Sequence, residues 1–291
     1  MPGAYLSISC FDLRSSSVTS WCHLDNENGP ERVVWAAAPE WTIEDLPNVG
    51  IRPDRYYRPV PLPGTNYLPY TGALMTVDPA GTGTDETTYT ITKTLNGLVF
   101  LLDAGGFPPG TGHSPETLEG IAKLAERYKV NKIIIEANFG DGMYAKLLQP
   151  HLMARYPVGV EEIKHNVQKE RHICDTLEPV IQSHRLVVNQ ALVQKDFDST
   201  QGYSIEHHQR YQLFFQLTRM TRDKGALAKD DRLDALAMAV AYWSKSLAVE
   251  TEKVVQAKRD EMLKAELERY MAHAIGYRPK GRLYATTGHE R

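Results

Sequence analysis

The chain has 291 residues, of which 42% are hydrophobic and 24% charged, which suits one large domain or one domain with extensions. Its formal net charge of −3 excludes a bulk surface for polyanions but leaves room for a local basic groove. Three scattered cysteines disfavour a disulfide framework or a zinc site, and neither a signal peptide nor a membrane span is recognisable, so we expect a soluble, cytoplasmic protein.

Residues 1–69 differ in composition from the rest of the chain. Seven prolines lie between Pro39 and Pro69, and proline fixes φ and removes a backbone donor. We therefore expect an N-terminal extension with an extended, proline-rich linker, while residues 1–25 give no clear pattern.

The folded body is expected to span residues 70–249 and to begin with three strands. The apolar run 72–78 ends in an acid, the run 87–94 alternates, and the run 97–106 follows a Leu-Asn-Gly turn signal. Short connections of this kind predict an antiparallel meander.

Helices and strands then alternate along the chain. Expected helices cover "SPETLEGIAKLAERYKV", "GMYAKLLQPHLMARY", "QKERHICDTLEPVIQSH", "YQLFFQLTRM" and "DDRLDALAMAVAYWSKSLA", and expected strands cover "NKIIIEAN", "VGVEEIK" and "RLVVN". This order predicts an α/β fold with a mixed sheet, antiparallel first and parallel later, flanked by helices. Residues 250–291 read as a charged helix and tail, with a narrow apolar stripe at Leu263, Leu267, Tyr270 and Ala274.

The stretch "TVDPAGTGTDETTYTI" resembles a nucleotide loop at first sight. Gly81 and Gly83 would be its first two glycines, but Glu86 stands where a third is needed, and a strand pattern follows instead of a helix. The glycines therefore favour a turn between two strands.

Acidic residues end two of the apolar strands and begin a helix. Asp78 and Glu136 close their strands, while Asp230, Asp231 and Asp234 lie at a helix start, with Asp231 and Asp234 on one face. Each acid alone is more simply a turn or capping residue. Together they could converge on Mg²⁺ or Mn²⁺, which prefer hard oxygen ligands and in pairs can hydrolyse phosphodiesters.

Several stretches in order between residues 70 and 245 resemble the C-terminal nuclease domain of the terminase large subunit of tailed bacteriophages, especially the podovirus type. They are "VDPAGTGTDETTY", "TLNGLVFLLDAGGF", "EANFGDGMYAKL", "KERHICDTLEPVIQSHRLVVN" and "LTRMTRDKGALAKDDRLDALAMA". The resemblance implies a ribonuclease-H-like fold and a two-metal endonuclease, using Mg²⁺ or Mn²⁺, that cuts concatemeric double-stranded phage DNA during packaging.

The resemblance also implies the site. Asp78 and Glu136 match the first two acids, and the third position favours Asp231, with Asp234 one turn on and Asp230 beside it. We therefore expect Asp78, Glu136, Asp231 and Asp234 to be catalytic and to bind metal, and Asp85 could add an outer ligand.

The implied partners are DNA, the portal protein, the small terminase subunit and a terminase ATPase domain. No Walker motif occurs in the sequence, so the chain alone is not expected to hydrolyse ATP or pump DNA. The implied location is the host-cell cytoplasm.

Basic residues for the DNA backbone cluster beside the acids of the helix start. Arg222, Lys224, Lys229 and Arg232 are the preferred candidates, with Arg219 nearby and a second group at Lys164, Lys169 and Arg171. Two other functions stay open: a resolvase or transposase-like nuclease on the same fold, or a docking module for the portal or small terminase whose nuclease is silent.

Overall fold

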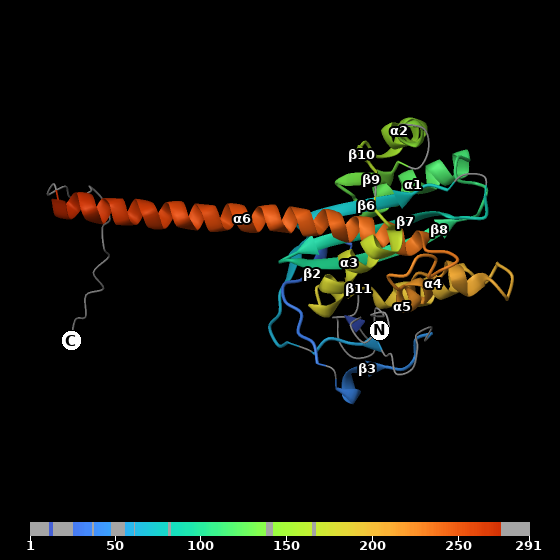
Figure 1. Cartoon of the computed structure of the whole chain (residues 1–291), viewed down its shortest axis with the longest axis horizontal. Helices are drawn as coiled ribbons and strands as arrows, with labels where there is room; N and C mark the ends of the chain where they lie inside the picture. The colour runs from blue at the N-terminus through green and yellow to red at the C-terminus, as the bar shows by residue number, and fades with distance from the viewer. Residues whose placement is uncertain are drawn as a thin grey trace. The chain divides into compact units, whose positions relative to one another are not determined.

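The computed structural model describes residues 12–13, 26–36, 38–47, 56–60, 62–80, 83–137, 142–164 and 167–274. The chain divides into two compact units, Met1–Trp243 and Ser244–Arg291. The first unit is built on a nine-stranded mixed sheet in the order β10-β9-β6-β7-β8-β11-β1-β4-β3, and a separate two-stranded sheet pairs β2 with β5 (Figure 1).

The centre of the sheet is the antiparallel meander expected from the sequence. It consists of β6 (Gly72–Asp78), β7 (Thr87–Leu95) and β8 (Leu98–Phe107). Asn96 and Gly97 both have positive φ between β7 and β8, which a type I′ hairpin turn requires. Gly81 lies outside the described residues.

Parallel strands extend the meander on both sides. On one side β9 (Lys132–Glu136) pairs with β6, and β10 (Gly159–Ile163) pairs with β9. On the other side β11 (Leu186–Val188) pairs with β8. The mixed, ribonuclease-H-like sheet predicted from the sequence is thus confirmed.

The segment before residue 70 contributes more strands than its prolines suggest. Beyond β11 the sheet continues with β1 (Asp12–Leu13), β4 (Tyr56–Tyr57) and β3 (Thr42–Ile43), while β2 (Asn28–Pro30) pairs with β5 (Tyr67–Pro69). Pro30 of β2 and Pro69 of β5 are tolerated because both strands are edge strands of their two-stranded sheet. The expected boundaries at 69/70 and 249/250 stay predictions.

Helices cover both faces of the sheet because successive strand residues point to opposite sides. Met75, Val77, Ile133 and Ile135 face a core shared with α1 (Pro115–Tyr128) and α2 (Met143–Arg155). Leu74 and Ile134 face the core formed with the remaining helices: α3 (Lys169–Gln182), α4 (Gln190–Ser199), α5 (Leu213–Arg219) and the first part of α6 (Asp231–Ala274).

Helix α4 is an element that the sequence interpretation missed. Its residues give only a weak amphipathic pattern, with Leu192, Val193 and Asp196 buried. The Asn189 side chain caps it by accepting a hydrogen bond from the Ala191 N–H at 3.2 Å. That capping residue was the signal available in the sequence.

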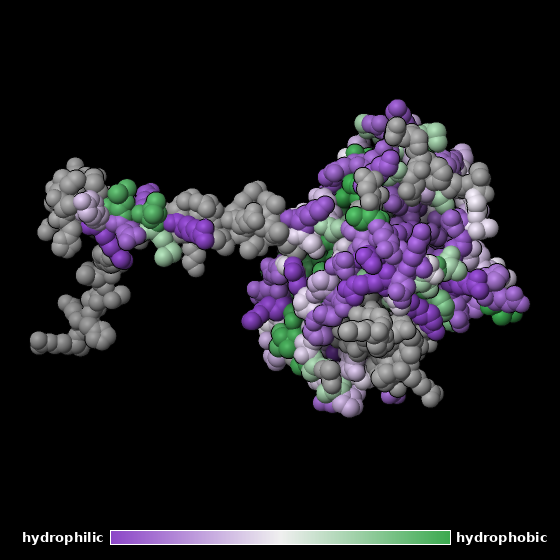
Figure 2. All heavy atoms as spheres, in the orientation of Figure 1, coloured by the Kyte–Doolittle hydropathy of each residue, from purple (hydrophilic) through white to green (hydrophobic). Residues whose placement is uncertain are grey.

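Helix α6 continues from the first unit into the second. In the second unit its exposed side chains include Met262, Leu263, Leu267 and Tyr270, and Figure 2 shows apolar residues gathered on this part. Among the described helices, none has the length and apolar character needed to cross a membrane.

Candidate metal centre

Two carboxylates lie side by side at the ends of adjacent parallel strands. Val77 of β6 pairs with Ile135 of β9, so the next residues, Asp78 and Glu136, are the last residues of their strands and lie at the same end of the sheet. Asp78 is only 5% exposed, whereas Glu136 is half-buried. The sheet register alone therefore brings these two acids together.

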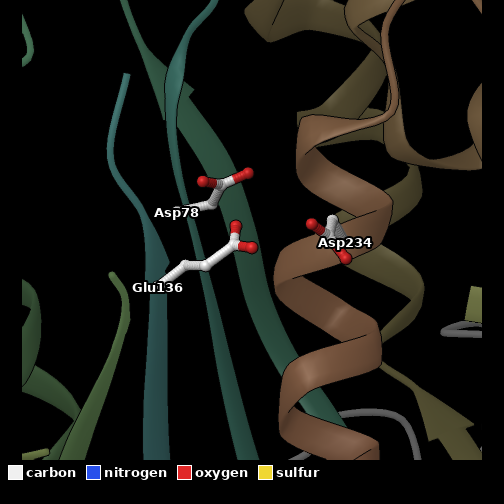
Figure 3. Close-up of side chains that lie close together, drawn as sticks. All are labelled: Asp78, Glu136 and Asp234. Carbon is white, nitrogen blue, oxygen red and sulfur yellow. The ribbon is translucent and has the colours of Figure 1, made fainter. Parts of the chain in front are cut away.

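The third carboxylate of the group comes from α6. Asp234 is 2% exposed, and one oxygen each of Asp78, Glu136 and Asp234 can be chosen so that all three lie within 4.8 Å of one another. Figure 3 shows the two strand residues and Asp234 turned toward one another across the gap between sheet and helix.

Hydrogen bonds from the sheet hold α6 in this position. The Thr76 hydroxyl donates to the Ala235 carbonyl at 2.6 Å, and the Thr88 hydroxyl donates to the Asp231 carbonyl at 2.9 Å. The Leu233 N–H, which has no partner within the first helical turn, donates to the Gln216 side chain at 3.0 Å. These contacts fix the rotation of the helix that presents Asp234.

The other acids at the helix start take different places. Lys169 of α3 lies 3.0 Å from a carboxylate oxygen of Asp230 and 3.1 Å from one of Asp234. Asp231 lies outside the group of three, and its Oδ2 is buried without a hydrogen-bond partner among the described residues. Asp85 is exposed and pairs with Lys229.

Burial and repulsion from neighbouring carboxylates raise the pKa values of Asp78, Asp231 and Asp234. Burial raises the pKa of Asp78 well above its ordinary value, and Glu136 and Asp234 add to the rise while Lys169 opposes it. Burial likewise raises the pKa of Asp231 to about 7 and that of Asp234 to about 6. Burial alone would lower the pKa of Lys169, but the neighbouring carboxylates, led by Asp234, raise it.

This donor set fits a divalent cation. Three convergent carboxylates supply the hard oxygen ligands that Mg²⁺ and Mn²⁺ prefer. Burial is the main cause of the raised pKa values of Asp78 and Asp234, and repulsion from the neighbouring carboxylates adds to it, so a cation between these groups would be favoured. The buried, unpartnered oxygen of Asp231 offers a further ligand one turn earlier on α6.

The basic residues expected to contact DNA differ in exposure. Lys224 is exposed, and Arg222 is half-buried and pairs with Asp175 at 3.1 Å and with Glu178 at 2.5 Å. Lys229 donates to the Thr84 carbonyl at 2.9 Å and pairs with Asp85. In the second group, Lys164 and Arg171 are exposed.

Arg232 requires a correction. Its side chain is 1% exposed and forms ion pairs with Glu86 at 2.8 Å and Asp196 at 2.7 Å. A guanidinium so enclosed has no surface to offer a phosphate, so Arg232 is not a DNA contact in this structure. The sequence does not reveal these partners, because Glu86 lies 146 positions and Asp196 lies 36 positions from Arg232, too far apart for any local spacing pattern.

Comparison with known proteins agrees with this architecture. The family model for the ribonuclease H-like domain of the bacteriophage T7 terminase matches residues 77–186. The terminase large subunit of enterobacteria phage T3 is 41% identical over 254 residues, which cover 87% of this chain and 42% of the T3 protein. The chain thus spans less than half the length of that curated relative.

Solved structures give weaker likenesses. The Mn-soaked, inhibitor-bound human cytomegalovirus terminase nuclease domain is 16% identical, with a TM-score of 0.42 over 60% of this chain and 82% of that chain. The nuclease domain of the Sf6 large terminase subunit gp2 is 10% identical, with a TM-score of 0.40 over 59% and 88%. Similarity this low bears on neither the site nor the activity. Over 87% of its length the chain is thus related in sequence to the terminase large subunit of phage T3, and residues 77–186 match the ribonuclease H-like nuclease domain of the T7 terminase.

Proposed function

We propose that this chain is the metal-dependent endonuclease part of a phage DNA-packaging terminase and cuts concatemeric double-stranded DNA. The observation that carries the proposal is the convergence of Asp78, Glu136 and Asp234, from two strand ends and a helix, with oxygens within 4.8 Å. A buried group of like charges is costly unless a cation or a proton compensates it. In a chain related to terminases, a divalent cation bound at a nuclease site would compensate the negative charge, and it would also explain why the three carboxylates converge.

Asp78, Glu136 and Asp234 would hold the Mg²⁺ or Mn²⁺ ions, with Asp231 as the further ligand for a second ion. Two such ions supply activation of water for attack on phosphorus and stabilisation of the departing 3′ oxygen. The protein fixes the ligand geometry through the β6–β9 register and the docking of α6. Lys169 offsets part of the negative charge and holds Asp234 in place.

Contacts with the DNA backbone would come from basic side chains near the metal site. Lys224 is exposed, and Arg222 and Lys229 lie in the same connection between α5 and α6. The Arg222 side chain and its carboxylate partners are partly exposed, and such surface pairs cost little to break. Lys229 is more enclosed, at 14% exposed, and also donates to Thr84. Lys224 and Arg222 can therefore turn to phosphates most easily when DNA approaches.

The wider assembly is part of the same proposal. As a relative of a terminase large subunit, the chain would act in packaging together with a terminase ATPase domain, a small terminase subunit and a portal protein. Its site of action would be the host-cell cytoplasm.

Plasmid cleavage in Mn²⁺ tests the proposal directly. The wild-type chain should convert supercoiled plasmid to nicked and linear forms, and the Asp78→Asn/Glu136→Gln double variant should not. Equal cleavage by both proteins would exclude these acids as the source of the activity.

A further inference from the structure

Arg232 has an environment that a surface ion pair does not provide. Its Nε lies 2.8 Å from Glu86 Oε2 and its Nη2 lies 3.0 Å from Glu86 Oε1, which makes a two-pronged contact. Its Nη1 lies 2.7 Å from Asp196 Oδ1 and 2.9 Å from Ser199 Oγ. All three guanidinium nitrogens are thus engaged, and the planar fork fixes the direction of the side chain.

The two carboxylates that hold Arg232 are themselves fixed. Asp196 of α4 also accepts the backbone N–H groups of Leu213 and Phe214, at 3.0 and 3.1 Å, at the start of α5. Glu86 accepts the Tyr203 hydroxyl at 2.6 Å. A Cβ at Gly106 would lie 2.2 Å from Glu86 Oε2, so only glycine leaves Glu86 its place. Arg232 therefore ties α6 to α4 and to the start of β7.

Helix geometry connects this anchor to the acids. Residues two apart on an α-helix point about 200° away from each other, so Arg232 and Asp234 lie on nearly opposite sides of the first turn of α6. A rotation of that turn that loosens the Arg232 contacts would also move Asp234 away from Asp78 and Glu136. One face of the turn is thus anchored while the other presents the carboxylate.

We infer that Arg232 is a positioning residue, whose buried pairs with Glu86 and Asp196 fix the start of α6 and so place Asp234 for metal binding. The inference rests on the proposed function, because it assigns Arg232 a role in the same metal site. It replaces the DNA contact expected from the sequence. A positive charge at residue 232 is not sufficient for this role. The two-pronged contact of the guanidinium with Glu86 is also needed, because it helps to set the rotation of α6.

The test uses Arg232→Lys, which keeps the charge and loses the fork, and Glu86→Gln, which keeps the shape of one partner and weakens the pair. Isothermal titration calorimetry with Mn²⁺ alone should give a dissociation constant raised roughly tenfold to hundredfold, the usual effect of removing support for a metal ligand. Without metal, amide hydrogen exchange at residues 231–237 should be faster in both variants.

Two control variants separate positioning from general destabilisation. Arg155→Lys alters a similar guanidinium held by Glu119 and Glu126, but on the surface of α2. Ile121→Val removes a methylene from the core beneath α1, on the other face of the sheet, and lowers stability without touching α6. Both controls should bind Mn²⁺ with the wild-type dissociation constant.

The outcomes distinguish this inference from the proposed function. If the wild-type chain binds Mn²⁺ and either folded anchor variant binds it equally well, the inference is overturned alone. It is also overturned if Ile121→Val weakens Mn²⁺ binding as much as Arg232→Lys does. If the wild-type chain binds no Mn²⁺, the proposed metal site is overturned and the inference with it.

Discussion

Asp234 rather than Asp231 completes the group of three carboxylates, although the two residues share a face of α6. We predict that Asp234→Asn lowers plasmid cleavage more than Asp231→Asn does. Charge stabilisation by a bound metal is worth several kcal/mol, so loss of a central ligand should cost on the order of 10²-fold or more in rate. Single-turnover cleavage at fixed Mn²⁺ measures both variants, and a larger loss for Asp231→Asn would assign the third ligand to Asp231.

The raised pKa of Asp234 gives a pH dependence with a definite sign. An unfolded chain loses the proton from this carboxyl near pH 3.8, but the folded chain keeps it to about pH 6. The unfolded state therefore binds fewer protons in that window, and this group makes the free energy of unfolding fall as pH rises from about 4 to 6.

Urea denaturation of wild type and Asp234→Asn in EDTA isolates this contribution. The variant should gain stability relative to the wild type as pH rises from 4.5 to 7, and added Mn²⁺ should stabilise the wild type more strongly. A difference between the two proteins that stays constant over this range would contradict a raised pKa at Asp234.

At the scale of elements, the start of α6 shows which features of the fold and the site the sequence could predict and which it could not. Periodicity, capping residues and turn signals predicted β6 to β11 and the helices α1, α2, α3, α5 and α6. The acids at the ends of β6 and β9 could be placed from the same signals. The choice between Asp231 and Asp234 could not, because helix rotation depends on distant hydroxyls such as those of Thr76 and Thr88.

Ion pairs between segments that are distant in the sequence could not be predicted either. Arg232 lies in a basic stretch, and only the folded chain shows that Glu86 and Asp196 enclose it. Lys169 appeared in the sequence as a candidate DNA contact, and the structure places its ammonium group on Asp230 and Asp234. Such pairs join separate elements and leave no local pattern.

The Thr76 hydroxyl carries part of the docking of α6 on the sheet. Thr76→Val keeps the shape of the side chain but leaves the Ala235 carbonyl with only the longer of its two side-chain contacts, the one from Thr90 at 3.2 Å. Losing a buried hydrogen bond should lower the free energy of unfolding by about 1–3 kcal/mol. Urea denaturation measures this, and Thr76→Ser, which keeps the hydroxyl, should lose less. If Thr76→Val is as stable as the wild type, the Thr76 hydroxyl does not stabilise the docking of α6.

At the scale of the whole molecule, the proposed DNA binding would have to come from local charge because the net charge is −3. Lys224→Ala should weaken DNA binding about equally for all sequences and reduce the slope of log K against log salt by about 1. The matched control is Lys123→Ala, since Lys123 is exposed on α1, which packs on the opposite face of the sheet. Fluorescence anisotropy in Ca²⁺ at several salt concentrations measures both slopes, and equal slopes would place the DNA elsewhere.

The most direct test of the account is a crystal of the chain soaked in Mn²⁺ and measured for anomalous scattering. We predict a peak bonded to carboxylate oxygens of Asp78, Glu136 and Asp234, at the point where β6, β9 and α6 meet. Asp78→Asn crystals soaked in the same way serve as the control and should lose or weaken that peak. A wild-type crystal with no peak between these three residues, or with one bound elsewhere, would contradict the metal centre.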